Sequence, residues 1–307
     1  MDNEQVSIVT DGMIDMAPEL VSRLGIHIVP WRGTRKGSLW PPLFSSFIQT
    51  YHRLQPSPVF SIHPAGSLSD VGHSARLARN LLMATKPSGV YEQGVLKPLV
   101  LSSPAQRRGL RVKVFEAKAI DLGVRFMVTV AAQAAQEGYN EEQLDLLLRR
   151  LQDEMMQTMI LTKDTSHLGR LLAPQGMSVR KKKENLIYID KERRAFSLVA
   201  QAESARQYVG QPEQFLRGVP QPCDLWIRQR GYDSAARQLI PHWKGLFQVE
   251  QVHTEAHGLG AGPYFGGDYL EVVFCPTGEA IERLKRFVKR MWKAFGSTTT
   301  ATASSQQ

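Results

Sequence analysis

The amino-acid sequence predicts an α/β fold in two domains: an N-terminal three-layer α/β/α domain with a mostly parallel sheet, and a C-terminal α/β domain with a mixed sheet. The chain has 307 residues, enough for two ordinary domains. Strand-like and helix-like segments alternate along its first half, which is typical of a parallel sheet covered by helices on both faces. After about residue 158 a hairpin-like run appears, which indicates some antiparallel pairing.

Apolar spacing and end signals define the elements of the first half. Pro18 and Gly25 bracket a short helix, and Asn140 is a suitable N-cap for a longer one. We expect strands at 6–11, 26–31, 58–63 and 111–117, and helices at 17–25, 43–54, 70–84, 123–138 and 140–157.

The second half has a different pattern. A hairpin running into a helix is expected within residues 184–202, with strands at 223–229, 246–253 and 269–274 and a helix at 231–243. With the boundary near Thr158, the predicted domains are residues 1–157 and 158–276. A basic amphipathic helix is expected at 277–296, and a disordered low-complexity tail at 297–307.

Cysteine content and the N-terminus indicate a cytoplasmic protein. Cys223 and Cys275 form neither a disulfide framework nor a metal-binding pair. The N-terminal segment is acidic and lacks the basic and apolar regions of a secretory signal. No apolar run approaches the roughly 18 residues that a membrane span requires.

The net charge of +9 concentrates at residues 180–183, at residues 191–194 and in the last helix. A basic surface can meet nucleic acid, an anionic membrane or an acidic partner. No RNA-binding aromatic motif, zinc finger or Walker loop accompanies these residues. Nucleic-acid binding is therefore not expected.

Four segments carry recognisable patterns. Residues 8–30 contain a Thr-Asp loop after the first strand, and residues 61–78 contain a Ser-rich loop that leads into a helix. Residues 112–138 contain a strand and a helix that ends in Glu-Gly, and residues 257–274 contain a His followed by a Gly-rich turn. In this order, and with the Leu-Gly-Arg-Leu turn at 168–171, they resemble the DegV family of bacterial fatty-acid-binding proteins. The matching residues of the first two segments are Thr10, Asp11, Asp15, Pro18, Leu20, His63, Leu68, Ser69, Ser74 and Ala75.

The resemblance implies a ligand slot between the two domains, a long-chain fatty acid as ligand and no cofactor or metal. It also implies a partner, a fatty acid kinase that phosphorylates the bound acyl group. This protein would then be a carrier and not an enzyme.

The chain departs from the family pattern around the Ser-rich loop. Residues 65–66 are Ala and Gly where the family has paired serines, and residues 70–71 are Asp and Val in place of Gly-Thr. Residues 116–117 are Glu and Ala in place of Asp-Ser, and Ser38 stands where a further hydroxyl-bearing loop is shortened. The chain is expected to be a divergent member.

A bound carboxylate requires hydrogen-bond donors. The helix starting near Ser69 directs its unpaired N–H groups toward the loop, and the hydroxyls of Ser67 and Ser69 can add to them, while Asp70 would repel the anion unless it is turned away. The alternative for Ser69 is a simple helix cap. The resemblance adds Thr10 and His257 as carboxylate ligands, and a lone His can equally be structural.

The acyl chain requires an apolar lining. Phe126, Met127 and Val130 of one helix and Leu81 and Met83 of another are the candidates, and the alternative is that they are ordinary core residues. Arg170, in the turn that resembles the family's Gly-Arg turn, is a candidate contact for a phosphate or the kinase, or else a solvated surface residue.

No GxSxG, HExxH or comparable motif predicts catalysis. An unrecognised enzyme would require a polar cleft with a perturbed acid or base. The second hypothesis is an interaction or regulatory protein that descends from the family and has lost lipid binding.

Residues 279–295 combine a helical apolar stripe with Arg and Lys on the opposite face. Such a helix can lie transiently on an anionic membrane surface, or it can pack on its own domain.

Overall fold

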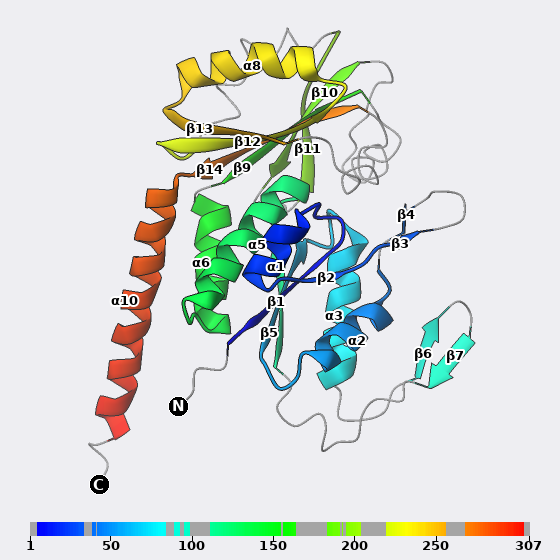
Figure 1. The fold of residues 1–307 in the computed structure, drawn as a ribbon, viewed down its shortest axis with the longest axis vertical. Coiled ribbons are helices and arrows are strands. Elements are labelled where there is room, and N and C mark those ends of the chain that lie inside the picture. Colours follow the sequence, from blue (N-terminus) through cyan, green and yellow to red (C-terminus); the bar gives the residue numbers. More distant parts are fainter. Residues whose placement is uncertain are drawn as a thin grey trace.

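The computed structural model describes residues 5–33, 39–40, 42–83, 89–92, 95–98, 111–154, 156–163, 183–190, 192, 195–203, 219–255 and 268–303. Two sheets lie one above the other along the long axis of the molecule (Figure 1). The predicted division into two α/β parts is visible in this arrangement.

The first sheet has four parallel strands in the order β2 (His27–Val29), β1 (Ser7–Asp11), β5 (Val59–Pro64) and β8 (Val112–Ala117). Parallel neighbours require crossover connections, and the helices supply them. The predicted parallel sheet is confirmed.

Helices cover both faces of this sheet. The helices α2 (Phe44–Arg53) and α3 (Asp70–Met83) pack on one face, against Val9 and Val59. The helices α1 (Pro18–Leu24), α5 (Asp121–Gln136) and α6 (Glu141–Glu154) lie on the other, against Ile8 and Ile62. Because side chains alternate along a strand, neighbouring residues of β1 face different layers, and the three-layer prediction is confirmed.

Two helix ends follow the sequence signals. Gly25 has a φ of +62°, the left-handed conformation that favours glycine at a helix C-terminus, and its N–H bonds the carbonyl of Ser22. Asn140 Oδ1 accepts from Gln143 N at 2.9 Å while Gln143 Oε1 accepts from Asn140 N at 3.0 Å. This reciprocal cap fixes the start of α6.

The second sheet contains six strands in a mixed arrangement. Its order is β11 (Ala195–Ala202), β10 (Glu184–Asp190), β9 (Gln157–Thr162), β14 (Tyr269–Pro276), β12 (Cys223–Arg230) and β13 (Val249–Glu255). All neighbours are antiparallel except β12 and β13, which are parallel. The predicted mixed sheet and the hairpin of β10 and β11 are confirmed. The helix expected at the end of the segment 184–202 is wrong, because β11 stays paired with β10 as far as Ala202.

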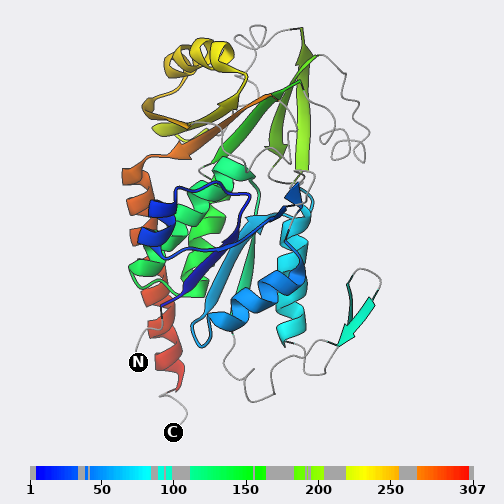
Figure 2. The ribbon, with the colours of Figure 1, turned by 45° about the vertical axis from the view of Figure 1, so that its right-hand side comes forward.

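One face of the second sheet lies under α8 (Asp233–Leu246), and the other faces the first domain (Figure 2). Along β14, Leu270 and Val272 pack in the α8 cluster, whereas Tyr269 and Val273 belong to clusters shared with the first domain. The two domains therefore meet through a continuous strand face.

Two small hairpins were not expected. β3 (Arg32–Gly33) pairs with β4 (Leu39–Trp40), and β6 (Gly89–Glu92) pairs with β7 (Val95–Pro98), which projects from the first domain in Figure 1. Strands of two to four residues are too short to give a clear alternation in sequence.

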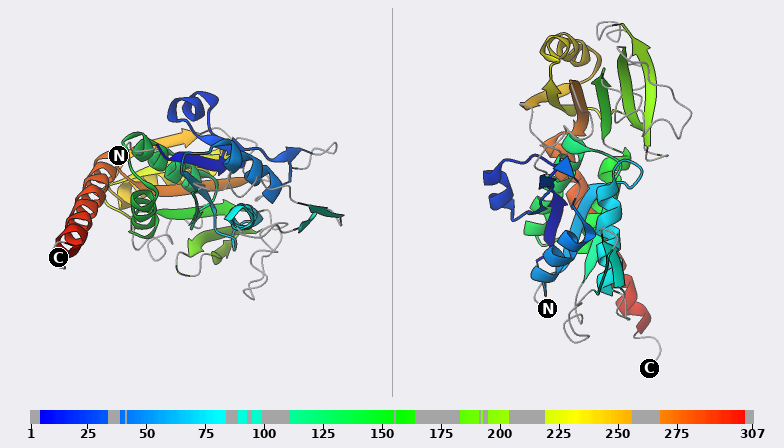
Figure 3. Two further views of the ribbon diagram at one scale, coloured as in Figure 1. Left: turned by 90° about the horizontal axis from the view of Figure 1, so that it is seen from below. Right: turned by 90° about the vertical axis from the view of Figure 1, so that its right-hand side faces the viewer.

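Helix α10 (Gly278–Ala303) runs beside α6 and reaches beyond the body of the first domain (Figure 3). It passes the predicted end at 296 and enters the segment 297–307 that we expected to be disordered. No proline follows Pro276, and one internal glycine, Gly296, costs a helix only about 1 kcal/mol. Among the described residues, no helix has the length and apolarity needed to cross a membrane.

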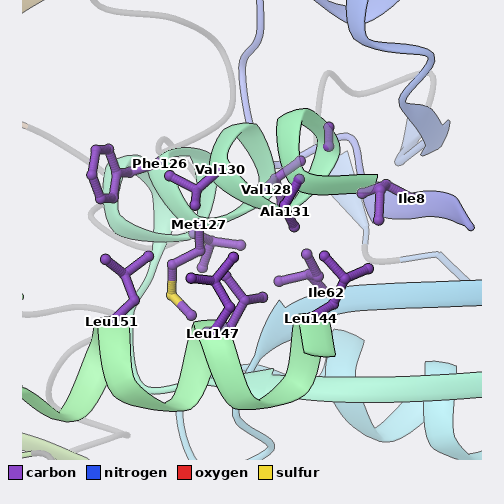
Figure 4. Packing of buried hydrophobic residues seen from close by; sticks show 14 of the residues in the cluster. Ile8, Ile62, Phe126, Met127, Val128, Val130, Ala131, Leu144, Leu147 and Leu151 are labelled. Atoms are coloured by element: carbon purple, nitrogen blue, oxygen red, sulfur yellow. The ribbon is translucent and has the colours of Figure 1, made fainter. Parts of the chain in front are cut away.

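The largest core cluster lies between α5 and α6 (Figure 4). Met127 points from α5 toward Leu147 and Leu151 of α6 in this view. Leu284 and Val288 of α10 belong to the same cluster, so α10 is anchored in the first domain by its first turns.

Candidate functional site

An apolar layer separates the loops of the first domain from the second sheet. Its members come from opposite sides of the domain interface and are all buried. They are Met13, Ala65, Leu68 and Ile120 from the first domain, and Ile160, Ile187, Ile189, Phe196 and Tyr269 from the second. We refer to these residues as the interdomain layer.

The loop between β5 and α3 borders this layer. Ala65 O accepts from Leu68 N at 2.8 Å and from Ser69 N at 3.0 Å, which closes the loop as a tight turn. Ser69 Oγ accepts from Val71 N at 3.3 Å, so Ser69 caps α3. The loop thus presents a helix start, with its N–H groups and positive dipole end, next to apolar residues.

Two glycines give this corner its shape. A Cβ atom on Gly72 would lie 2.5 Å from the carbonyl oxygen of Pro64, so only glycine lets α3 approach the end of β5 this closely. A Cβ atom on Gly66 would lie 3.1 Å from Arg76 Nη2. Arg76 Nη1 in turn contacts Glu116 Oε1 at 2.8 Å. An arginine and a glutamate therefore lie against the loop backbone.

A chain of buried polar groups runs behind the loop. Tyr51 Oη donates to Ser61 Oγ at 2.8 Å, Ser61 Oγ lies 2.7 Å from His63 Nε2, and His63 Nδ1 lies 2.9 Å from Asp11 Oδ2. Trp31 Nε1 donates to Asp11 Oδ1 at 2.8 Å. Burial raises the pKa of Tyr51, which keeps its hydroxyl protonated as the donor at the end of the chain.

The Asp11, His63 and Ser61 side chains have the order of a nucleophile triad, but all three are fully buried. The Ser61 hydroxyl is also partnered by both Tyr51 and His63. In this arrangement the chain fixes Asp11, which also accepts from Met13 N at 3.0 Å. It thereby orients Met13, a member of the interdomain layer.

An ionic cluster forms a second polar centre between the domains. Arg228 Nη1 donates to both carboxylate oxygens of Asp121 at 2.7 Å, and Arg228 Nη2 donates to Glu255 at 2.7 Å. Arg125 contacts the same Glu255 carboxylate, and Glu271 Oε2 accepts from Leu122 N at 3.5 Å. Arg228, Asp121 and Glu271 are buried, so side chains of both domains meet in a water-excluded site.

Burial sets the ionisation of this cluster. It raises the pKa of Asp121 to about 6, against the opposing effect of Arg228. It raises the pKa of Glu271 well above the usual range, and the nearby Asp121 carboxylate adds to the shift. Glu271 Oε1 has no hydrogen-bond partner among the described residues. A protonated carboxyl is therefore favoured here.

No known protein-family model matches the chain, and no curated protein sequence matches it. Solved structures do. The fatty-acid-binding DegV family protein of Thermus thermophilus superposes with a TM-score of 0.68 at 18% identity, over 89% of this chain and 100% of that one.

DegV of Bacillus subtilis, a fatty-acid-binding protein, superposes with a TM-score of 0.65 at 16% identity, over 89% and 100% of the two chains. A stearic-acid-binding protein of Eubacterium ventriosum gives 0.67 at 12% identity, over 90% and 99%. The chain has the DegV fold. The resemblance seen in the sequence is thus confirmed at the level of architecture.

The predicted carboxylate ligands lie in different parts of this fold. Ser67 is exposed in the loop, and Ser69 caps α3. Thr10 is buried in β1, and its hydroxyl donates to the carbonyl of Ile62 at 2.9 Å. His257 and Arg170 lie outside the described residues.

The predicted pocket residues of α5 lie in the core of the first domain. Phe126, Met127 and Val130 belong to the cluster between α5 and α6 and not to the interdomain layer (Figure 4). The Phe126 ring lies 5.8 Å from that of Trp226, at the domain contact. Leu81 is partly buried on α3.

Sequence reasoning missed both polar centres of this DegV fold. For the buried chain the sequence shows only that Ser61 and His63 lie on one face of β5. The pairing of Val9 with Ser61, which places Asp11 beside His63 on that face, follows from the order of the strands. For the ionic cluster the signal was Arg228, a charge on the other face of a strand whose Leu225 and Ile227 are core residues. Among the described residues, no group of three or more His, Cys, Asp or Glu side chains is placed to hold a metal ion.

Proposed function

We propose that this protein binds a long-chain fatty acid and buries the acyl chain between its two domains. The observation that supports this most is the interdomain layer, an apolar contact that borders a helix start in a DegV fold. Proteins of the same fold bind fatty acids, including heptadecanoic, vaccenic and stearic acid. The interdomain layer would open and line the slot.

Apolar burial would carry most of the affinity. Each buried methylene contributes about 0.8 kcal/mol, so a long acyl chain gains on the order of 10 kcal/mol before ordering costs. A hydrogen bond to a charged group contributes about 1.5–3 kcal/mol. Loss of the serines at 65–66 therefore weakens head-group selection more than it weakens binding.

The carboxylate would lie at the loop before α3. Ser67, Ser69 and the N–H groups of the helix start are its donors in this proposal, with His257 as a further ligand. Thr10 contributes less, because its single hydroxyl hydrogen is donated to Ile62. Among the predicted lining residues, Phe126 would border the slot near Trp226, whereas Met127 and Val130 would support it from the core. Leu81 lies about three turns along α3 from the loop and would contact only an acyl chain that extends along this helix.

A partner would do the chemistry. We propose that a fatty acid kinase phosphorylates the presented carboxylate and that Arg170 contacts the kinase or the phosphate. The protein itself would be a carrier with no cofactor. The exposed position of Ser67 supports this orientation, because a head group beside it could be reached from solvent.

Lipid extraction and native mass spectrometry of the purified full chain test the proposal. We expect a co-purifying fatty acid, and after delipidation we expect stoichiometric uptake of stearic acid. Absence of both a co-purifying acyl chain and any uptake would contradict fatty-acid binding. That outcome would favour the second candidate, an interaction or regulatory protein that has lost lipid binding. This second candidate is supported by the direct packing of Ala65 and Leu68 in the interdomain layer.

Transient membrane contact through residues 279–295 is a separate part of the proposal. Phe287 and Trp292 are 40% and 38% exposed on α10, and Arg286, Lys289 and Arg290 are exposed beside them. An apolar edge flanked by basic side chains complements an anionic membrane surface, where an acyl carrier would collect or deliver its ligand.

A further inference from the structure

Arg76 is a cationic side chain that lies against the loop before α3. Its Nη2 atom is 3.1 Å from the position that a Gly66 Cβ would occupy, and the Arg76 side chain is 42% exposed. A side chain at position 66 would meet the guanidinium. The glycine therefore leaves room for a positive charge on the loop, at the place where the proposed carboxylate would bind.

Glu116 forms an ion pair with this guanidinium. Its Oε1 atom lies 2.8 Å from Arg76 Nη1, and it is 3.7 Å from the Cβ position of Gly72 and 3.8 Å from that of Gly66. The Glu116 carboxylate thus occupies the corner between the loop and the helix start. An incoming carboxylate would meet this internal anion.

We infer that Arg76 is the head-group-binding residue of this protein and that Glu116 competes with the ligand for it. The inference rests on the proposed function, because it names the residue that recognises the carboxylate at that site. A guanidinium has several N–H donors in a planar fork, so it can bind a ligand carboxylate through one edge. Glu116 holds the fork in place while no ligand is bound, and its negative charge opposes an anionic ligand.

This arrangement predicts opposite effects for the two partners of one ion pair. Arg76→Gln removes the donor fork and should weaken binding of stearic acid. Glu116→Gln removes the competing charge and leaves Arg76 available, so it should strengthen binding. Because Arg76 is partly exposed, solvent screens the interaction, and we expect changes of about three- to tenfold in Kd in each direction. A purely structural ion pair would give losses for both variants.

The experiment measures the Kd of the delipidated full-length protein for stearic acid and for octadecan-1-ol by calorimetric titration. The alcohol has the same chain and no charge, so its Kd should change little in either variant. Arg237→Gln on α8 is the matched control, because it removes an exposed arginine far from the loop and lowers the net charge equally. Arg76→Lys keeps the charge without the fork and should recover part of the affinity.

The outcomes distinguish a failure of the role inferred for Arg76 and Glu116 from a failure of fatty-acid binding itself. An Arg76→Gln affinity for stearic acid equal to that of the wild type, or a Glu116→Gln affinity equal to or weaker than that of the wild type, overturns the role of this pair. No binding of either ligand by the wild-type protein overturns the proposed function instead. Thermal unfolding of each variant, compared with Arg237→Gln, confirms that the folded protein is being titrated.

Discussion

At the scale of single residues, Gly72 determines how closely α3 approaches the end of β5. A Cβ atom there would lie 2.5 Å from the carbonyl oxygen of Pro64, a backbone atom that cannot turn away. Because the loop of residues 65–69 connects these two elements, a shift of α3 would also move the candidate head-group site. The geometry of the site thus depends on a residue that has no side chain.

Gly72→Ala should therefore destabilise the protein by about 1–3 kcal/mol, the usual cost of overpacking. Gly245→Ala is the matched control, because a Cβ atom at this glycine of α8 would have no neighbour within 4 Å. Alanine is a better helix former than glycine, so the control should be neutral or more stable by up to about 1 kcal/mol. Urea unfolding measures both variants. Equal stability of the two would refute the close approach at Gly72.

Local sequence signals predicted the candidate loop but not the two polar centres. The loop of residues 61–78 was predicted as an anion site from local signals, namely small residues, hydroxyls and a helix start. The polar centres depend on distant partners: Asp11 and His63 are 52 residues apart, and Asp121 and Arg228 are 107 apart. No local pattern encodes such pairs, because only the order of the strands brings them together.

At the scale of elements, periodicity and caps located the long helices and the core strands. These signals did not locate the short hairpins, and they placed the end of α10 too early. That helix has two parts: Leu284, Lys285 and Val288 are buried, and Lys285 Nζ donates to Glu137 at 2.6 Å, whereas Trp292 one turn later is exposed. The apolar stripe thus continues past the surface that covers it.

Trp292→Ser should weaken binding to anionic phosphatidylglycerol vesicles by roughly three- to tenfold, because a tryptophan contributes to interfacial binding. Met83→Ser is the control, since Met83 is exposed at 52% on α3, away from α10. Co-sedimentation with vesicles measures the effect, and added salt should reduce binding of the wild type. Removal of the whole helix is a poor test, because it would also remove Leu284 and Val288 and expose the core residues of the first domain against which they pack. Equal binding by both variants and the wild type would exclude α10 as the contact.

At the scale of the whole molecule, the two domains are joined by an ionic centre flanked by apolar contacts. Val273 and Cys275 of β14 pack into the core of the first domain, and Tyr269 of the same strand lies in the interdomain layer. Glu271 stands between them and takes part in the ionic cluster. A ligand that enters the interdomain layer would bind next to these buried charges.

The charges of this centre should make the stability of the folded protein depend on pH. Asp121, Glu271, Glu255 and Asp15 face Arg228 and Arg125, so carboxyls outnumber guanidiniums. Burial raises the pKa of Asp121 to about 6 and that of Glu271 well above the usual range. The folded protein therefore binds protons that the unfolded chain has released. Stability from these groups is present below the unfolded pKa of about 4 and declines as pH rises through the folded values.

Glu271→Gln should remove part of this decline, because the amide is neutral at every pH and keeps an oxygen that can accept from Leu122 N. We expect the variant to unfold at a higher temperature than the wild type at pH 8, with the difference shrinking toward pH 5. Glu250→Gln, at an exposed position of β13, controls for the loss of one negative charge. Thermal unfolding at several pH values measures the three proteins. The contrary outcome is that the unfolding temperature of Glu271→Gln falls as steeply with rising pH as that of the Glu250→Gln control. It would show that Glu271 is already ionised in the folded protein, with its charge compensated by Arg228.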